Sequence, residues 1–169
     1  MAEDFTWLDG ERLVRFGEGA SREAGRLLVE RGFDGYALLT TERALTALPA
    51  LAEGADAVVR VPTGKVDELS AALLEDAGRR PLVALGGGRV VDVAKAVAGA
   101  GGAACAAIPT TLAGSPMTRF HRTPAGVEGA GLVRPSLVVA DPPLMASQPG
   151  PQRAASAMNA LAHAMESLY

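Results

Sequence analysis

Short apolar runs alternate with longer segments of helical periodicity along most of the chain. Strands are predicted at Arg12–Phe16, Tyr36–Thr40, Ala57–Val61, Pro81–Leu85, Ala104–Ile108 and Pro135–Asp141. Helices are predicted at Ser21–Arg31, Glu42–Leu51, Val66–Ala77, Val90–Ala98 and Gln152–Tyr169. Because the strands carry few polar residues, they are typical of a parallel sheet with helices on both faces. The pattern therefore predicts an α/β fold, a doubly wound Rossmann-like parallel sheet.

Local signals refine this outline at three places. Arg12–Phe16 is short and is expected at an edge of the sheet, and Ser21 is the expected N-cap of the first helix. Residues Arg119–Arg134 carry Gly126, Gly129 and Gly131, which favour a hairpin or a flexible excursion.

Composition narrows the classes of function. The 169 residues fit one domain of the usual size of about 100–200 residues. With 16 Lys and Arg against 19 Asp and Glu, the net charge of −3 leaves no basic excess for nucleic-acid phosphates or anionic lipid. The single cysteine, Cys105, cannot form an internal disulfide, which favours a reducing compartment. Met1–Gly10 contains no apolar run typical of a signal peptide, so we expect a cytoplasmic protein without nucleic-acid or membrane partners.

Three glycines follow the predicted strand Pro81–Leu85 and open the next helix, in the segment GGGRVVDVAK from Gly86 to Lys95. Glycine lets the backbone approach a ligand closely, and the free N–H groups at a helix start favour a phosphate. The segment matches neither the GxGxxG fingerprint nor a Walker A loop, and a tight turn without a ligand is the alternative. Asp92 and Lys95 lie on one helical face, where they either reach a ligand or pair with each other.

Hydroxyl side chains gather after the next predicted strand, Ala104–Ile108. Ligands bind at the carboxyl edge of an open parallel sheet, so these hydroxyls and the glycine turn together predict a cofactor cleft. A loop that satisfies its own backbone is the alternative for the hydroxyls alone. They belong to Thr110, Thr111, Ser115 and Thr118.

The ordered segments GGGRVVDVAK, IPTTLAGSPMT, VVADP and MNALAHAMESLY resemble the iron-containing alcohol dehydrogenase and dehydroquinate synthase-like superfamily. The last segment is most similar to the maleylacetate reductase branch. The resemblance runs from about Phe16 to Tyr169, and four motifs in order are far more specific than any one of them. It implies an NAD(P)-binding α/β domain over residues 1–150 and the start of a helical C-terminal domain over residues 151–169. The chain is then expected to stop inside the helix Gln152–Tyr169 and to be inactive alone.

The resemblance also implies roles for single residues. Gly87 and Gly88 hold the cofactor pyrophosphate, and Thr41 takes the position where relatives that choose NAD often have an acid. Arg89 replaces the usual serine, and Arg43 lies near Thr41, so we expect NADPH to be accepted alongside NADH. The full implied set of cofactor-binding residues is Thr41, Gly86, Gly87, Gly88, Arg89, Val90, Asp92, Lys95, Thr110, Thr111, Ser115 and Thr118.

Two residues of the last segment bear on the chemistry. Metal-dependent relatives have an Asp and a His four residues apart, whereas this chain has Asn159 and His163. A neutral amide oxygen is a weaker ligand than a carboxylate, so a metal ion is not expected. Asn159 and His163 are the candidate catalytic residues, and the alternative for His163 is a buried histidine bonded to backbone.

The expected function is the NAD(P)H-binding part of an oxidoreductase that reduces maleylacetate, or a similar small anionic unsaturated keto acid, to 3-oxoadipate by hydride transfer. Such a reaction belongs to the catabolism of aromatic compounds, and the complete protein is expected to form a homo-oligomer, a dimer, by similarity to its relatives. Two alternatives stay open: a metal-dependent alcohol dehydrogenase of the same superfamily, and a non-catalytic nucleotide-binding fragment or subunit that needs a partner chain.

Overall fold

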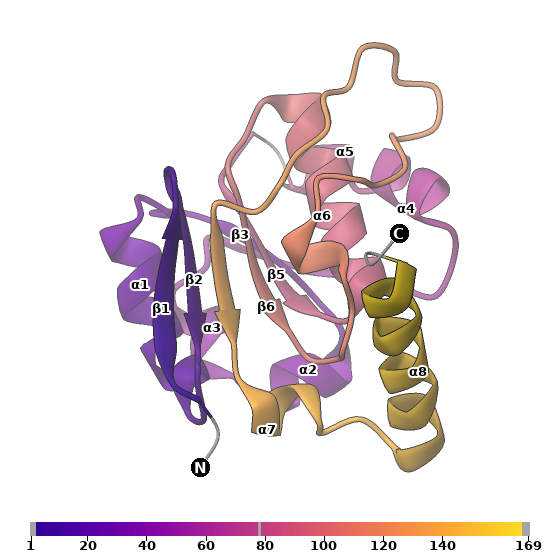
Figure 1. The fold of residues 1–169 in the computed structure, drawn as a ribbon. Helices are drawn as coiled ribbons and strands as arrows, with labels where there is room; N and C mark the ends of the chain where they lie inside the picture. The colour runs from indigo at the N-terminus through magenta and orange to yellow at the C-terminus, as the bar shows by residue number, and fades with distance from the viewer. Residues whose placement is uncertain (1–2, 78, 167–169) are drawn as a thin grey trace.

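The computed structural model describes residues 3–77 and 79–166, without the side chains of residues 163, 164 and 166 (Figure 1). The strands are β1 (Phe5–Asp9), β2 (Arg12–Phe16), β3 (Ala37–Thr40), β4 (Ala57–Arg60), β5 (Leu82–Gly86), β6 (Cys105–Pro109) and β7 (Leu137–Ala140). The α-helices are α1 (Ala24–Glu30), α2 (Glu42–Ala47), α3 (Ala50–Glu53), α4 (Val66–Ala72), α5 (Leu74–Ala77), α6 (Gly88–Gly101), α7 (Pro142–Met145) and α8 (Gly150–Glu166). Two 3-10 turns complete the described elements, η1 (Ala20–Glu23) and η2 (Ser115–Met117).

The sheet has seven strands in the order β1-β2-β7-β6-β5-β3-β4. All neighbouring pairs are parallel except β1 and β2, which are antiparallel. After β3 the chain adds β4 on one side and then crosses to place β5 on the other side of β3. The carboxyl ends of β3 and β5 therefore form a topological switch point, which is where open α/β sheets bind ligands. The predicted α/β architecture is confirmed, with one antiparallel strand added.

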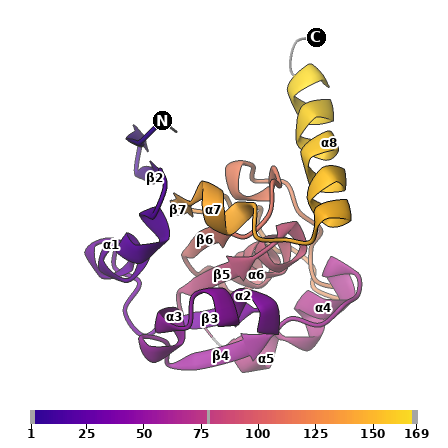
Figure 2. The ribbon, with the colours of Figure 1, turned by 90° about the horizontal axis from the view of Figure 1, so that it is seen from below.

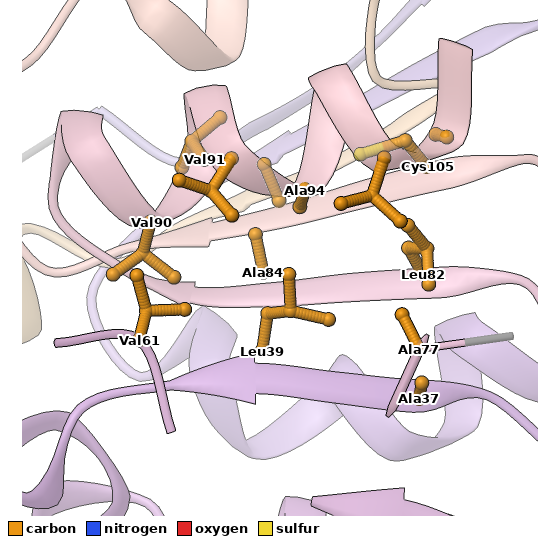
Figure 3. Packing of buried hydrophobic residues seen from close by; sticks show 14 of the residues in the cluster. Ala37, Leu39, Val61, Ala77, Leu82, Ala84, Val90, Val91, Ala94 and Cys105 are labelled. Atoms are coloured by element: carbon orange, nitrogen blue, oxygen red, sulfur yellow. The ribbon is translucent and has the colours of Figure 1, made fainter. Parts of the chain in front are cut away.

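Alternate residues of the central strands enter two apolar layers, one on each face of the sheet. On one face Leu39 and Ala84 pack beneath α4, α5 and α6, in the cluster shown in Figure 3. On the other face Leu38 and Val83 pack against α1, α2, α3 and α7. Because both faces are covered, the central strands consist almost entirely of apolar residues.

Several elements differ from the sequence-based predictions. The strand β1 was not predicted, and it covers the outer edge of β2, so Arg12–Phe16 is not an edge strand. The helix predicted from Glu42 is divided into α2 and α3, since Pro49 cannot supply a backbone donor to continue it. The helix predicted at Val66–Ala77 is likewise divided into α4 and α5.

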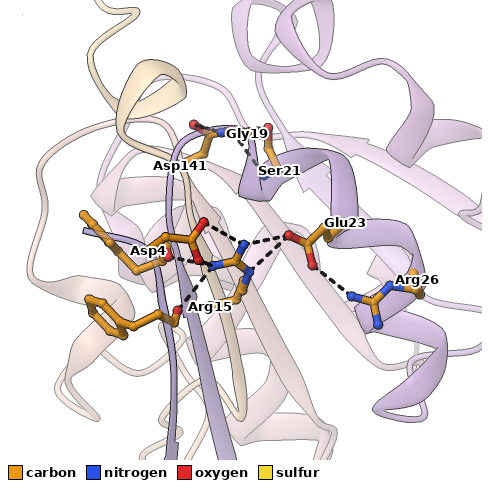
Figure 4. Close-up of polar contacts among 9 residues, drawn as sticks. Asp4, Arg15, Gly19, Ser21, Glu23, Arg26 and Asp141 are labelled. Atoms are coloured by element: carbon orange, nitrogen blue, oxygen red, sulfur yellow. Dashed lines mark hydrogen bonds and ion pairs between the residues drawn. The ribbon is translucent and has the colours of Figure 1, made fainter. Parts of the chain in front are cut away.

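Ser21 does not cap the first helix, because its side chain has another partner. Its hydroxyl donates to the carboxylate of Asp141, which also accepts the backbone N–H groups of Gly19 and Ser21. Figure 4 shows these contacts beside an ion-pair network in which Arg15 of β2 contacts Asp4 and Glu23. The hydrogen bonds to Asp141 and the ion pairs of Arg15 together hold the hairpin β1–β2 and the start of α1 against the end of β7.

Residues 119–134 contain neither a strand nor a helix, so the hairpin alternative is wrong. The segment packs on α6 through a close backbone contact, in which the N–H of Gly131 donates to the carbonyl of Gly99 at 3.1 Å. His121 also contributes, because its Nε2 accepts the N–H of Val133 at 3.0 Å. The loop is thus held by these hydrogen bonds together with Val133, which packs against the apolar layer on this face of the sheet.

The helix α8 extends away from the body of the sheet (Figure 2). It begins at Gly150, two residues before the predicted start, and residues 167–169 of the predicted helix lie outside the described residues. Met158, Leu161 and Met165 are exposed along it. No helix within residues 3–77 and 79–166 is long and apolar enough to cross a membrane.

Candidate functional site

The glycine turn between β5 and α6 leaves space that side chains would fill. None of Gly86, Gly87 and Gly88 has a positive φ, so these glycines are required for close approach rather than for backbone conformation. A Cβ at Gly86 would lie 2.7 Å from Val90 Cβ, and one at Gly87 would lie 3.1 Å from Cγ2 of Thr111. A Cβ at Gly88 would lie 3.4 Å from the hydroxyl of Ser115. The glycines therefore bring the start of α6 against the loop of residues 110–118, which carries Thr110, Thr111, Ser115 and Thr118 and is called the hydroxyl loop below.

The start of α6 presents free donors. Gly87 is the N-cap residue and has an extended backbone and no side chain. The first N–H that donates within the helix is that of Val91, to the carbonyl of Gly87, so the amides of Gly88, Arg89 and Val90 have no acceptor in the helix. A helix of 14 residues concentrates partial positive charge at this end. Arg89 is exposed there and forms no ion pair with the described acidic residues. This combination of donors and charge suits an anion.

Two cavities meet at this helix end. The first encloses about 280 Å3 and the second about 500 Å3, and both are lined by Gly88 and Arg89. The remaining lining of the first cavity is Thr41, Arg43, Gly87, Val90, Thr111, Gln148, Gln152 and Ser156. The remaining lining of the second is Asp92, Ala113, Gly114, Ser115, Thr118, Phe120 and Asn159. We refer to the two together as the switch-point cleft.

Thr41 and Arg43 bring the end of β3 to the first cavity. The hydroxyl of Thr41 accepts the N–H of Ala44 at 3.3 Å and so caps α2. Arg43 Nη2 donates to the hydroxyl of Thr110 at 3.0 Å, and its Nη1 donates to the hydroxyl of Ser147 at 3.1 Å. Arg43 thereby crosses the sheet edge from β3 towards β6 and β7.

Lys95 is a buried residue that supports the second cavity from behind. Its side chain has no exposed surface, and Nζ donates to Asp92 at 3.1 Å and to the carbonyls of Ser115 and Phe120 at 3.1 and 2.7 Å. Burial lowers the pKa of the Lys95 ammonium, and the neighbouring Asp92 partly opposes that shift. Lys95 thus fixes the hydroxyl loop, and Phe120 just after it, by hydrogen bonds from its ammonium group to their backbone carbonyls.

The structure brings most of the predicted site residues together. Nine of the twelve cofactor candidates line the cleft, whereas Gly86, Thr110 and Lys95 are buried behind it. Asn159 of α8 lines the second cavity, and the side chain of His163 lies outside the described residues. Among the residues that the structure describes, no group of three or more His, Cys, Asp and Glu side chains is placed to hold a metal ion.

Sequence reasoning missed the contribution of the segment around α8. Gln148, Gln152 and Ser156 complete the first cavity, and the hydroxyl of Ser156 donates to the carbonyl of Leu112 at 2.9 Å. The position of Gln148 in the sequence could have indicated this contribution. Gln148 follows β7, and the carboxyl end of β7 lies at the same sheet edge as the glycine turn.

A larger hollow of about 600 Å3 lies farther along the same edge, between Arg22 and Asp141. The carboxylate of Asp141 is 3% exposed and already accepts three hydrogen bonds from η1 and the residue before it. Glu18 lines the same hollow, and two acidic side chains make the hollow a poor site for an anion. The switch-point cleft is therefore the better candidate for a phosphate-bearing ligand.

A parallel sheet with a topological switch point, where a glycine turn leads into a helix beside a donor-rich cleft, defines a Rossmann-like class of α/β domain. The chain belongs to the iron-containing alcohol dehydrogenase family, whose model matches residues 15–149. Members of this family, which includes maleylacetate reductases, are oxidoreductases.

Similarity extends to characterised relatives and solved structures. The chain is 36% identical over 168 residues to a maleylacetate reductase of Sphingobium indicum, covering 92% of this chain and 47% of the relative. It matches the crystal structure of maleylacetate reductase from Agrobacterium tumefaciens with a TM-score of 0.78 and 29% identity, over 100% of this chain and 51% of the other. Sulfoacetaldehyde reductase from Bifidobacterium kashiwanohense, solved in complex with NAD+, shares the fold with a TM-score of 0.60 at 22% identity, over 86% of this chain and 48% of the other. The chain spans about half the length of these relatives.

Proposed function

We propose that the chain forms the NAD(P)H-binding part of a reductase that acts on maleylacetate or a similar small unsaturated keto acid and yields 3-oxoadipate. The observation that carries the proposal is the switch-point cleft, in which the glycine-rich start of α6, two arginines and the hydroxyl loop line two cavities that share Gly88 and Arg89. The relatives named maleylacetate reductase support the choice of substrate, and the reductase solved with NAD+ supports the choice of cofactor.

The cleft fits a dinucleotide in its shape and in its donors. The missing side chains of Gly87 and Gly88 leave the helix amides accessible to a pyrophosphate, and Arg89 adds a positive charge beside them. Thr111, Ser115 and Thr118 supply hydroxyls for the ribose and nicotinamide side. The bound cofactor supplies a hydride.

The residues of the second cavity act on the substrate. In the reduction, hydride adds to one carbon of the substrate carbon–carbon double bond, electron density moves to the conjugated keto oxygen, and a proton from the medium or an acidic group completes the product. Asn159 lines this cavity and is suited to donate an amide hydrogen bond to the developing enolate oxygen. His163 follows one turn later on α8, and we assign it the role of acid or hydrogen-bond donor.

A metal ion is not part of the proposal. The amide of Asn159 offers a divalent cation a neutral oxygen where a carboxylate would supply charge. Enolate stabilisation then falls to hydrogen-bond donors that are already oriented towards the developing charge.

Binding and turnover of the purified protein test the proposal. Calorimetric titration with NADH and NADPH should show saturable binding, and Gly88→Val should weaken it, because the added side chain enters the space shared by both cavities. Gly101→Ala is the matched control, since a Cβ at Gly101 has nothing within 4 Å. Absence of binding to either dinucleotide would refute the proposal. Because the chain alone is expected to be inactive, turnover is tested with a protein that also contains the remaining half of the relatives' length, and binding without oxidation of the cofactor by maleylacetate in that protein would refute the proposed substrate.

A further inference from the structure

The first cavity contains a buried side-chain amide without a partner. Gln148 is 7% exposed, and its Nε2 has no hydrogen-bond partner among the residues that the structure describes. A buried donor that lacks an acceptor loses its hydration without compensation, so such groups are rare in folded proteins. Because Gln148 lines the first cavity, an acceptor on a ligand in that cavity would satisfy it.

Arg43 stands beside Gln148 with unused hydrogen-bonding capacity. It bonds to the hydroxyl of Ser147, the neighbour of Gln148, and to the hydroxyl of Thr110. Both partners are neutral, and Arg43 forms no ion pair with an acidic residue in the part of the chain described here. A guanidinium carries five N–H donors, so most of them remain for a ligand, and its charge is uncompensated.

The lining of the first cavity supplies donors and no carboxylate. Arg43 and Arg89 both line it, whereas no Asp or Glu with a described side chain does. The hydroxyl pair of an adenosine ribose is recognised by an acceptor, commonly an acid after a sheet strand, while a 2′-phosphate is recognised by arginine. Thr41 follows β3, and its oxygen is already engaged in capping α2. These walls therefore suit a phosphate better than a ribose diol.

We propose that Arg43 and Gln148 form a subsite for the 2′-phosphate of NADPH, and that the protein binds NADPH more tightly than NADH. Arg43 supplies charge-assisted hydrogen bonds, and the amide of Gln148 donates to a phosphate oxygen. This assignment rests on the proposed function, because it requires the cleft to hold a dinucleotide. It adds a preference for NADPH over NADH, which the similarity to known reductases does not define.

The test is calorimetric titration of the purified protein with NADPH, NADH and adenosine 2′,5′-bisphosphate. Arg43→Gln and Gln148→Leu should each lower the affinity for NADPH and for the bisphosphate by about tenfold or more, since each removes a hydrogen bond to a charged group. The affinity for NADH should change by less than about twofold. The control is Arg26→Gln, because Arg26 lies on α1, is exposed and lines neither cavity of the cleft.

Thermal unfolding separates a ligand contact from a structural role. Gln148→Leu removes an unpaired buried donor while keeping apolar volume, so the free protein should melt at the same temperature or higher. Higher stability with weaker NADPH binding supports the subsite. Equal losses for NADPH and NADH, or a wild-type protein that binds NADH as tightly as NADPH, would overturn it and leave dinucleotide binding intact. A wild-type protein that binds neither would instead refute the proposed function.

Discussion

Replacing Gly99 with alanine should destabilise the protein, although alanine is the better helix former. Gly99 lies in the last turns of α6, where the loop of residues 119–134 crosses the helix. A Cβ at this position would lie 2.1 Å from the carbonyl oxygen of Gly131 and 3.1 Å from its carbonyl carbon. Both are backbone atoms, so the overlap is relieved only when the loop moves away from the helix.

The expected magnitude follows from two opposing contributions. Overpacking of this kind costs about 1–3 kcal/mol, and the backbone-to-backbone contact places Gly99→Ala at the upper end of that range. The hydrogen bond from Gly131 to Gly99 contributes about 1 kcal/mol more when it is lost. The gain in helix propensity offsets about 1 kcal/mol. The free energy of unfolding should therefore fall by about 3 kcal/mol, which lowers the melting temperature by roughly 6–12 °C for a chain of this size.

Urea and thermal denaturation followed by circular dichroism measure this change. The matched control is Gly101→Ala in the same helix, where a Cβ meets nothing within 4 Å. Because only the propensity and unfolded-state effects remain there, we expect this variant to gain about 0.4–1 kcal/mol. Equal stability of the two variants would show that the loop does not rest on Gly99.

Three further predictions concern the cleft, the core and the metal. Thr41→Asp should weaken NADPH binding by about tenfold, as measured by titration, because its carboxylate repels a 2′-phosphate, and an equal loss for NADH would contradict this. Burial raises the pKa of Cys105 to about 12 from 9.0, so the native thiol should react slowly with an alkylating reagent near neutral pH. Since the unfolded thiol ionises first, this contribution to stability is complete below about pH 9 and is lost as the pH rises towards 12, which pH-dependent unfolding of Cys105→Ala and wild-type protein would measure. Protein purified without chelator should contain no stoichiometric iron or zinc by elemental analysis, and an equimolar content would favour a metal-dependent alcohol dehydrogenase.

The central strands could be predicted from the sequence because burial on both faces leaves an unbroken apolar run. The strand β1 could not be predicted in this way, since most of its residues are exposed and it is held by pairing with β2. The Asp9-Gly10 pair between two alternating runs was the available hairpin signal, and Gly10 has a φ of 61° at that turn. The division between α2 and α3 depends on Pro49, and α4 ends before Leu73, whose backbone is not helical; the periodicity of apolar residues alone resolves neither division.

The candidate site was predictable in outline because parallel strands end at one edge, so motifs distant in sequence converge there. The burial of Lys95 was not predictable, because its partners include backbone carbonyls of a loop without regular structure. Gln148 carries no motif, and only its burial without a partner marks it. The catalytic assignment of His163 stays a prediction.

The walls of the switch-point cleft come from four separate segments, from Thr41 after β3 to Asn159 on α8. During synthesis, a chain that has emerged only as far as the glycine turn holds the amides proposed to bind phosphate but lacks the opposite wall. Parallel pairing over such long separations forms slowly, so dinucleotide binding should develop only after β7 and the start of α8 have docked. Cofactor present in the cell would then stabilise only the finished fold, and its supply would influence how much of the newly made chain persists.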